Sequence, residues 1–116
     1  MDQYLEPVEE IDSESRSFTR ALMSLKEEIE AVMWYQQRVS AGEEDELKEV
    51  LAHNRDEEIE HACMALEWLR RNMDGWDENL RTYLFTEERI TELEEEEENE
   101  EEGFDKDLGI GDLKSV

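Results

Sequence analysis

The sequence is short of cysteine, proline, glycine and long apolar runs. Its 116 residues include one cysteine, Cys63, one proline and five glycines. A lone cysteine excludes a disulfide within the chain and a zinc site built from several of its cysteines, and it fits a reducing compartment. We interpret Cys63 as a small, semi-buried apolar residue. No segment approaches the roughly 20 apolar residues that span a bilayer, and no basic and apolar leader is present. We therefore expect a cytoplasmic protein that does not enter membranes.

Positive charge is also scarce. Twelve Lys and Arg residues stand against 36 Asp and Glu residues, which gives a formal net charge of −24. Such a charge excludes electrostatic binding of nucleic acid or anionic membranes, because each phosphate contact would have to overcome long-range repulsion. Hydrophobic residues make up 37% and charged residues 41% of the chain. This mixture suits long helices that bury an apolar stripe against partner helices. We expect a homo-oligomer that attracts cations.

Composition divides the chain into four regions. Residues 1–16 are acidic and contain the only proline, and we interpret them as a flexible arm. Residues 17–91 hold the helix-forming part. Residues 92–106 begin with a run in which nine of eleven residues are glutamate, and the repulsion within it predicts a disordered linker. Residues 107–116 place three aliphatic side chains among glycines, which is typical of a short extended ligand for a partner; the alternative is a tail without function. These three are Leu108, Ile110 and Leu113.

Apolar spacing predicts two long antiparallel helices and a shorter third in an all-α fold. The first helix carries apolar residues at steps of three, four, three and seven, at Leu22, Leu25, Ile29, Val32 and Val39. The chain is predicted to break at 40–42 and at 74–75, where glycine occurs. The segment WDENLRTYLFT then predicts a short C-terminal helix, with its apolar residues at Trp76, Leu80, Tyr83 and Leu84.

The second long helix has an apolar stripe with a polar middle. Glu58 and His61 lie three residues apart on this stripe, so they point the same way and can hold one metal ion. Burying such groups is costly unless they are paired or bind a cation. Glu28 and, two turns further, Tyr35 lie beside the apolar stripe of the first helix. The carboxylates of Glu28 and Glu58 and the imidazole of His61 form a ligand set that suits iron or manganese.

Ferritin-like carboxylate bundles build a two-metal site from one Glu on each of two helices and one Glu-x-x-His on each of the other two. This chain holds half of that set. We therefore predict a ferritin-like half-bundle that dimerisation completes to a four-helix bundle, with the metals at the subunit interface.

Three segments carry a more specific resemblance. The runs KEEIEAVMWYQQRV, AHNRDEEIEHACMALEWLRRN and LRTYLFTE, over about Leu22 to Glu87, resemble the encapsulated ferritin family. The ending LGIGDLK is similar to the cargo-loading peptides that dock such proteins inside encapsulin shells. The resemblance implies an iron-oxidising protein that assembles as a ring-shaped decamer of dimers. It also implies that the protein lacks the closed cage of ordinary ferritin and stores its mineral inside the encapsulin nanocompartment.

The resemblance also assigns residues to roles. Glu28, Glu58 and His61 match the ferroxidase ligands, which bind two iron ions per dimer interface, and Tyr35 matches an aromatic residue that supports them. A second group matches residues near the entry path of iron, where calcium or another divalent cation could also bind: Glu27, Glu30 and Trp34. From the residues alone, Glu27 and Glu30 would be interpreted as a solvated acidic face. The aliphatic residues of the tail match the shell-docking peptide.

Two hypotheses from different classes follow. The first is a ferroxidase that oxidises Fe(II) with dioxygen and supplies iron for storage. The second is a non-enzymatic, acidic helical adaptor that binds divalent cations and is recruited through its tail. A rubrerythrin-like peroxidase is disfavoured because the chain lacks a four-cysteine site. His53 and Glu57 could bind a metal at i, i+4 spacing, but they lie off the stripe and are interpreted as a surface pair.

Overall fold

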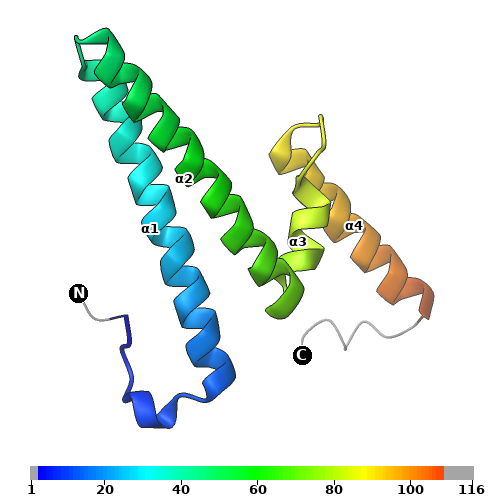
Figure 1. Cartoon of the computed structure of the whole chain (residues 1–116). Coiled ribbons are helices and arrows are strands. Elements are labelled where there is room, and N and C mark those ends of the chain that lie inside the picture. The colour runs from blue at the N-terminus through cyan, green and yellow to red at the C-terminus, as the bar shows by residue number, and fades with distance from the viewer. Residues whose placement is uncertain (1–2, 109–116) are drawn as a thin grey trace. The chain divides into compact units, whose positions relative to one another are not determined.

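The computed structural model describes residues 3–108, and for 104–108 it describes the backbone alone. The described residues form only helices: the 3-10 helix η1 (Val8–Glu10) and the α-helices α1 (Ser13–Ala41), α2 (Asp45–Asn72), α3 (Trp76–Tyr83) and α4 (Ile90–Leu108). The predicted all-α class is confirmed. η1, α1 and α2 belong to one compact unit, and α3 and α4 belong to another (Figure 1). Within the described residues, no helix is long and apolar enough to cross a membrane.

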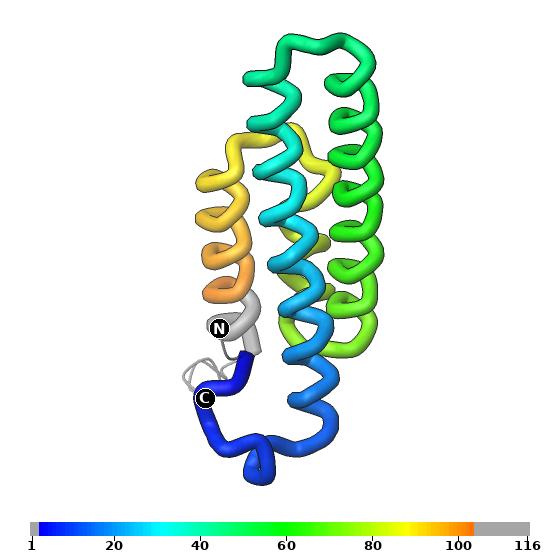
Figure 2. The backbone as a smooth tube through the Cα atoms, turned by 60° about the vertical axis from the view of Figure 1, so that its left-hand side comes forward, coloured from blue at the N-terminus to red at the C-terminus, as the bar shows by residue number. Residues whose placement is uncertain are grey.

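The first unit is an antiparallel hairpin of α1 and α2 (Figure 2). The Asp12 carboxylate caps α1 by accepting a hydrogen bond from the Ser15 amide at 2.7 Å. The Glu44 carboxylate caps α2 by accepting from the Leu47 amide at 2.7 Å. Gly42 ends α1 where a Cβ atom would lie 2.9 Å from the Arg38 carbonyl oxygen, so the turn requires glycine. The predicted break at 40–42 is therefore where the hairpin turns.

The interior of the hairpin is narrow. Leu69 is its only fully buried side chain among the described residues, at 0% exposure. The rings of Phe18 and Trp68 meet edge to face with centroids 6.3 Å apart. On α1, Gln36 accepts a hydrogen bond at 2.8 Å from Arg55 on α2. The hairpin is held by one thin apolar layer and this polar bridge, and it leaves most of its large apolar side chains partly exposed.

Two local features differ from the sequence-based expectations in this unit. Helix α1 begins at Ser13, inside the stretch 1–16 that the sequence assigns to a flexible arm. The Arg16 guanidinium donates a hydrogen bond to the Val8 carbonyl, which ties η1 to the first turns of α1. Cys63 is exposed rather than semi-buried, because its position on α2 turns away from α1.

The second unit pairs the predicted short helix, α3, with a helix that the sequence did not predict. Gly75 precedes α3 with φ +98°, a conformation that L side chains rarely adopt. Helix α4 covers the glutamate run expected to be a disordered linker. Glutamate is a good helix former, and α4 packs against α3, where Leu93 is only 9% exposed. Helix propensity and packing against α3 therefore outweigh the repulsion between neighbouring glutamates of α4. The composition of the run does not reveal this packing.

Side chains also join α3 to α4. The Thr82 hydroxyl donates a hydrogen bond to a Glu97 carboxylate oxygen at 2.5 Å. Partial burial, followed by the charges of Glu94, Glu97 and Glu98, raises the pKa of the Tyr83 phenol. Both observations place the acidic surface of α4 against α3.

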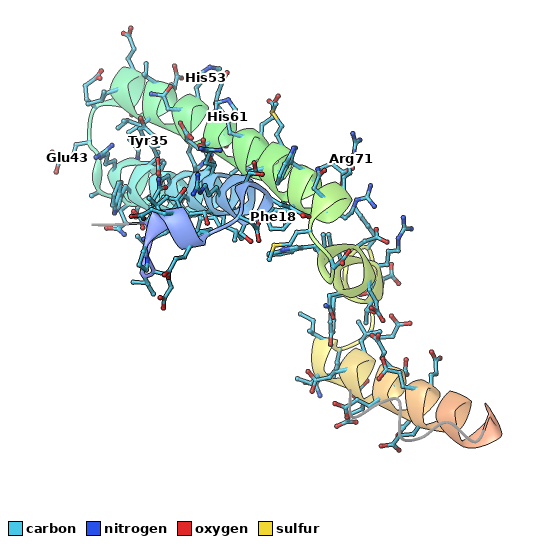
Figure 3. The ribbon with its side chains drawn as sticks, turned by 90° about the horizontal axis from the view of Figure 1, so that it is seen from below. Phe18, Tyr35, Glu43, His53, His61 and Arg71 are labelled. Carbon is cyan, nitrogen blue, oxygen red and sulfur yellow. The ribbon has the colours of Figure 1, made fainter. Side chains whose placement is uncertain are left out.

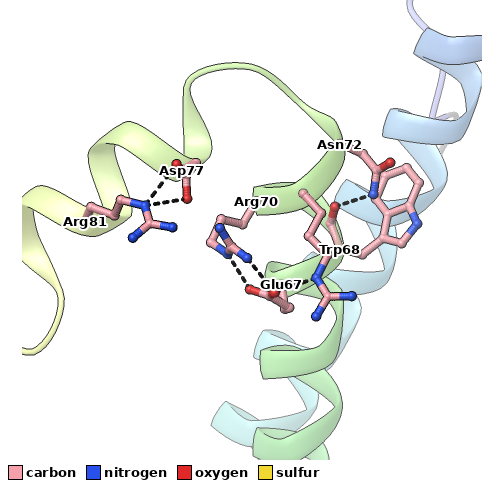
Figure 4. Close-up of polar contacts among 7 residues, drawn as sticks. Glu67, Trp68, Arg70, Asn72, Asp77 and Arg81 are labelled. Carbon is pink, nitrogen blue, oxygen red and sulfur yellow. Dashed lines mark hydrogen bonds and ion pairs between the residues drawn. The ribbon is translucent and has the colours of Figure 1, made fainter.

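A three-residue ion cluster lies near the end of α2 (Figure 4). The Glu67 carboxylate accepts hydrogen bonds from Arg70 Nε and Arg71 Nε, both at 2.6 Å. Hydrogen bonds from Arg70, then Arg71, lower the pKa of Glu67 to about 2. Because this pKa is below its ordinary value of 4.5, the stabilisation is complete above about pH 4.5 and is lost as the pH falls towards about 2.

We expect this pH dependence to appear in urea unfolding of the wild type and Glu67→Gln. Their midpoints should differ by a constant amount from about pH 7 to about pH 5, and the difference should shrink steadily below that. A difference that is unchanged at about pH 2.5 would contradict the assignment. Arg20, which lies on α1 and outside this cluster, offers a control in Arg20→Gln, whose difference from the wild type should not follow this profile.

Candidate metal centre

Three potential ligands converge between α1 and α2. Glu28 comes from α1, and Glu58 and His61 come from successive turns of one face of α2. One ligand atom from each lies within 4.8 Å of the others. His61 Nδ1 is 3.8 Å from Glu28 Oε2 and 3.7 Å from Glu58 Oε2. These separations exceed those of hydrogen bonds, so the three groups face a common point without being bonded to one another.

The cluster is half open to solvent. The side chains of Glu28 and Glu58 are 26% and 25% exposed, and that of His61 is 46% exposed. In the part of the chain that the structure describes, neither carboxylate forms an ion pair with a lysine or arginine. Two partly desolvated carboxylates with one imidazole make a hard donor set that suits a divalent cation such as Fe(II).

His61 also belongs to an exposed stripe of α2, which we call the site strip. Its members recur every three or four residues or at multiples of these steps, so they share one face of the helix. Four large apolar side chains of the strip are exposed in the single chain: Leu47, Val50, Met64 and Trp68. Glu57, seven residues from both Val50 and Met64, lies among them. The candidate metal cluster therefore opens beside apolar side chains that the hairpin leaves partly exposed.

The structure places the other predicted residues outside this cluster. Tyr35 lies two turns after Glu28, partly buried, with the Arg38 guanidinium carbon 5.2 Å from its ring centroid (Figure 3). Glu30 is paired with Lys26 at 3.9 Å, while Glu27 and Trp34 are exposed. Within one chain, these three entry-path candidates form no three-ligand group among the described residues.

Two further groups of potential metal ligands lie outside this cluster. Glu78 on α3 and Glu97 and Glu101 on α4 bring carboxylate oxygens within 4.8 Å of one another. The composition of the glutamate run predicts disorder, so the sequence did not indicate this group; the i, i+4 spacing of Glu97 and Glu101 was the available signal. His53 Nε2 and Glu57 Oε1 form an exposed pair 3.2 Å apart, as a surface pair would.

The tail lies largely outside the described residues. Ile110 and Leu113 are among the residues that are not described, and Leu108 is described only as the last backbone position of α4. Their predicted docking role stays a prediction.

Comparison with known proteins identifies the family. A family model described as EncFtn-like matches residues 3–87, which contain both helices of the hairpin and all three members of the metal cluster. The chain belongs to the EncFtn-like family. The predicted resemblance to encapsulated ferritins is thereby confirmed, and membership of a ferritin-like family supports an iron-related role.

Individual EncFtn-like relatives agree with this assignment. A ferritin-like protein of Thermotoga maritima is 61% identical over 112 residues, covering 97% of this chain and 98% of the relative. An encapsulated ferritin-like protein of Rhodospirillum rubrum is 58% identical over 89 residues, covering 77% of this chain and 64% of the relative. A crystal structure of a Nitrosomonas europaea protein matches with a TM-score of 0.75 and 54% identity, covering 77% of this chain and 98% of the other.

Proposed function

We propose that this EncFtn-like chain is a ferroxidase that oxidises Fe(II) with dioxygen at a di-iron site shared by two copies. The convergence of Glu28, Glu58 and His61 carries the proposal. Two copies related by a two-fold axis supply four glutamates and two histidines, which is the ligand set of ferritin-like di-iron bundles. One copy supplies only half of it.

The exposed site strip supports a second copy at this position. A soluble chain rarely leaves several large apolar side chains exposed on one stripe unless a partner covers them. Pairing two hairpins over their site strips would bury Leu47, Val50, Met64 and Trp68 and bring the two clusters together, completing a four-helix bundle. The same pairing would exclude water from the centre, where electrostatic interactions then strengthen.

The chemistry follows from the donor set. Fe(II) is the substrate; each ion gives up one electron and dioxygen is the acceptor. The carboxylates of Glu28 and Glu58 bind the entering cation and stabilise the more highly charged ferric product, since hard oxygen ligands favour the higher charge. His61 would supply a nitrogen ligand. Tyr35, two turns along α1, would close that end of the shared site.

The proposal also covers how Fe(II) reaches the site and where the ferric mineral is stored. Glu27, Glu30 and Trp34, repeated by symmetry around a ring of dimers, would form a carboxylate-lined entry for Fe(II), at which calcium or another divalent cation could compete. The tail would dock in an encapsulin shell through Leu108, Ile110 and Leu113. The name of the R. rubrum relative, an encapsulated ferritin-like protein, supports this location. The ferric mineral would then form inside the nanocompartment.

The decisive experiment loads the protein with Fe(II) without oxygen and then admits air. Ferric absorbance should rise rapidly in the wild type and saturate at about one iron per chain, since two chains share two ions. The variant Glu58→Ala/His61→Ala should lose this fast phase, because it loses two of the three ligands. The variant His53→Ala/Glu60→Ala removes the same residue types from exposed positions of α2 outside the site strip and should retain it.

The acidic adaptor hypothesis makes the opposite prediction. Under it, both double variants would oxidise Fe(II) as slowly as the wild type, and cation binding would follow the overall charge. That result would refute the ferroxidase proposal. Retention of the fast phase in Glu58→Ala/His61→Ala would instead show that oxidation occurs elsewhere on the chain.

A further inference from the structure

Helix α3 supports only part of α4. The two helices have 8 and 19 residues, so α3 spans about 12 Å and α4 about 28 Å, and α3 cannot run beside the whole of its partner (Figure 1). Leu93, which is buried, and Glu97, which accepts the hydrogen bond from Thr82, both lie in the first half of α4. We call residues 90–97 the proximal half of α4 and residues 98–108 the distal half.

The distal half is open to water as far as its side chains are described. Every residue from Glu98 to Gly103 is exposed. One group of α3 that comes near the distal half is the Glu78 carboxylate, which has an oxygen within 4.8 Å of carboxylate oxygens of Glu97 and Glu101. Because these charges are alike, their approach opposes the packing of the two helices. Burial against α3 thus stabilises the proximal half, and the distal half depends on its own helix propensity.

Like charges repeat at helical spacing within the distal half. Residues three or four apart are neighbours on a helix, and two like charges at this spacing destabilise it. The distal half contains four such pairs of acidic residues: 98 with 101, 98 with 102, 101 with 105, and 102 with 105. It contains one pair of opposite charge at this spacing, Glu102 with Lys106. Asp105 and Asp107 also lie near the end of the helix, where the helix dipole disfavours negative charge.

The balance between helix and coil is therefore close in the distal half. The proximal half already supplies the nucleus, which is the costly step, so each further residue only has to extend the helix, with a propagation factor of about 1–1.6 for good helix formers. Gly103 lies in the middle of the distal half, and glycine favours helix about fivefold less than alanine. A Cβ atom at Gly103 would meet nothing within 4 Å, so no close contact requires glycine there. Small changes in charge repulsion can then decide whether the distal half is helical.

We propose that the distal half of α4 is a helix–coil switch that responds to the concentration of cations around it. It is helical where cations screen its carboxylates, and it unfolds where they do not. Neighbours on one face of a helix are about 5–6 Å apart, while the Debye length is about 30 Å at 0.01 M salt, about 8 Å at 0.15 M and about 3 Å at 1 M. Repulsion between neighbours therefore persists at physiological ionic strength and is screened as the concentration approaches 1 M.

The proximal half gives the switch a fixed end. Leu93 and the hydrogen bond between Thr82 and Glu97 hold it to α3, and Glu92 lies in the first turn of the helix, where the dipole favours negative charge. Unfolding of the distal half would thus lengthen the segment that precedes residues 109–116 and leave the rest of the unit in place. The switch uses no residue of the metal cluster, so it is independent of iron oxidation.

The first test is circular dichroism of the full chain at about 222 nm in sodium fluoride from about 0.01 M to about 1 M, the range over which the Debye length falls about tenfold. The helical signal of the wild type should rise with salt, by no more than the residues 98–108 can supply. Asn99→Pro breaks the helix at an uncharged, exposed position and should remove this rise. The proposal is overturned if the wild type shows no rise, or if Asn99→Pro keeps it, since salt would then act elsewhere on the chain.

The second test separates local repulsion from net charge in the same titration. Glu98→Gln/Glu101→Gln removes three of the four repulsive pairs, so the helical signal at low salt should be higher than in the wild type and the rise with salt smaller. Glu9→Gln/Glu10→Gln removes the same charge from exposed positions of η1 and should behave as the wild type does. Equal curves for the two double variants would overturn the proposal.

A third variant changes helix propensity without changing charge. Gly103→Ala fits the open space around this position and should raise the helical signal at low salt, because alanine favours helix about fivefold over glycine. A curve identical to that of the wild type would show that the distal half is not in balance between helix and coil, and this too would overturn the proposal.

Discussion

Replacing Leu108, Ile110 and Leu113 with serine is expected to reduce loading into encapsulin shells to background while leaving Fe(II) oxidation unchanged. Burial of each aliphatic side chain contributes about 1.5 kcal/mol or more, and about 1.4 kcal/mol corresponds to tenfold in affinity. Loss of all three should therefore abolish docking of the tail. The measurement is co-expression with an encapsulin, purification of the shells, and quantification of the co-purifying chain.

A second tail variant tests whether loading into the shell depends on the aliphatic side chains of the tail or on its charges. Asp107→Asn/Asp112→Asn changes two of the tail's residues but keeps its aliphatic side chains, and loading should persist. If the triple serine variant still loads, the tail is not the docking element. If both variants lose loading, recognition requires the charges of the tail as well as its apolar side chains.

Leu69→Ala is expected to lower the free energy of unfolding by about 2–5 kcal/mol, the range measured when buried leucines are truncated. Leu69 is the only fully buried side chain among the described residues, so little else compensates for the cavity. Urea unfolding at fixed protein concentration measures the effect, because assembly makes stability depend on concentration.

Leu5→Ala provides the control for this prediction. Leu5 is 98% exposed, and its truncation should change the free energy of unfolding by no more than about 0.5 kcal/mol. Equal midpoints for Leu69→Ala and the wild type would mean that the hairpin core contributes little and that assembly contacts hold the fold.

Local signals in the sequence predicted most of the hairpin. Helix breaks at Gly42 and Gly75 follow from backbone geometry that the residue type determines. The pair Glu58 and His61 follows from helical spacing. Spacing alone did not predict Glu28 as a third ligand, because the first helix contains several acidic residues. Its prediction depended on its position beside the apolar stripe and on the family resemblance.

The features that the sequence could not predict depend on contacts between distant residues. Composition alone predicts disorder for the glutamate run, but the hydrogen bond from Thr82 to Glu97 and the burial of Leu93 require α3 and α4 to be packed together. The hydrogen bond between Gln36 and Arg55 likewise depends on the packing of α1 against α2, because these residues are far apart in the sequence. The positive φ of Phe85 has no signal in the residue type, because phenylalanine disfavours it.

Helix α4 also sets the reach of the segment that precedes the proposed docking peptide. As a helix, its 19 residues span about 28 Å, whereas the same residues fully extended would span about 63 Å. A helical spacer therefore has less than half the reach of an extended one, and a peptide attached to its end would explore a smaller volume. In an oligomer with many tails, such confinement raises the effective concentration of the remaining tails once one has bound. If the tails dock as proposed, the glutamate helix would thus convert several weak docking peptides into avidity for a single shell.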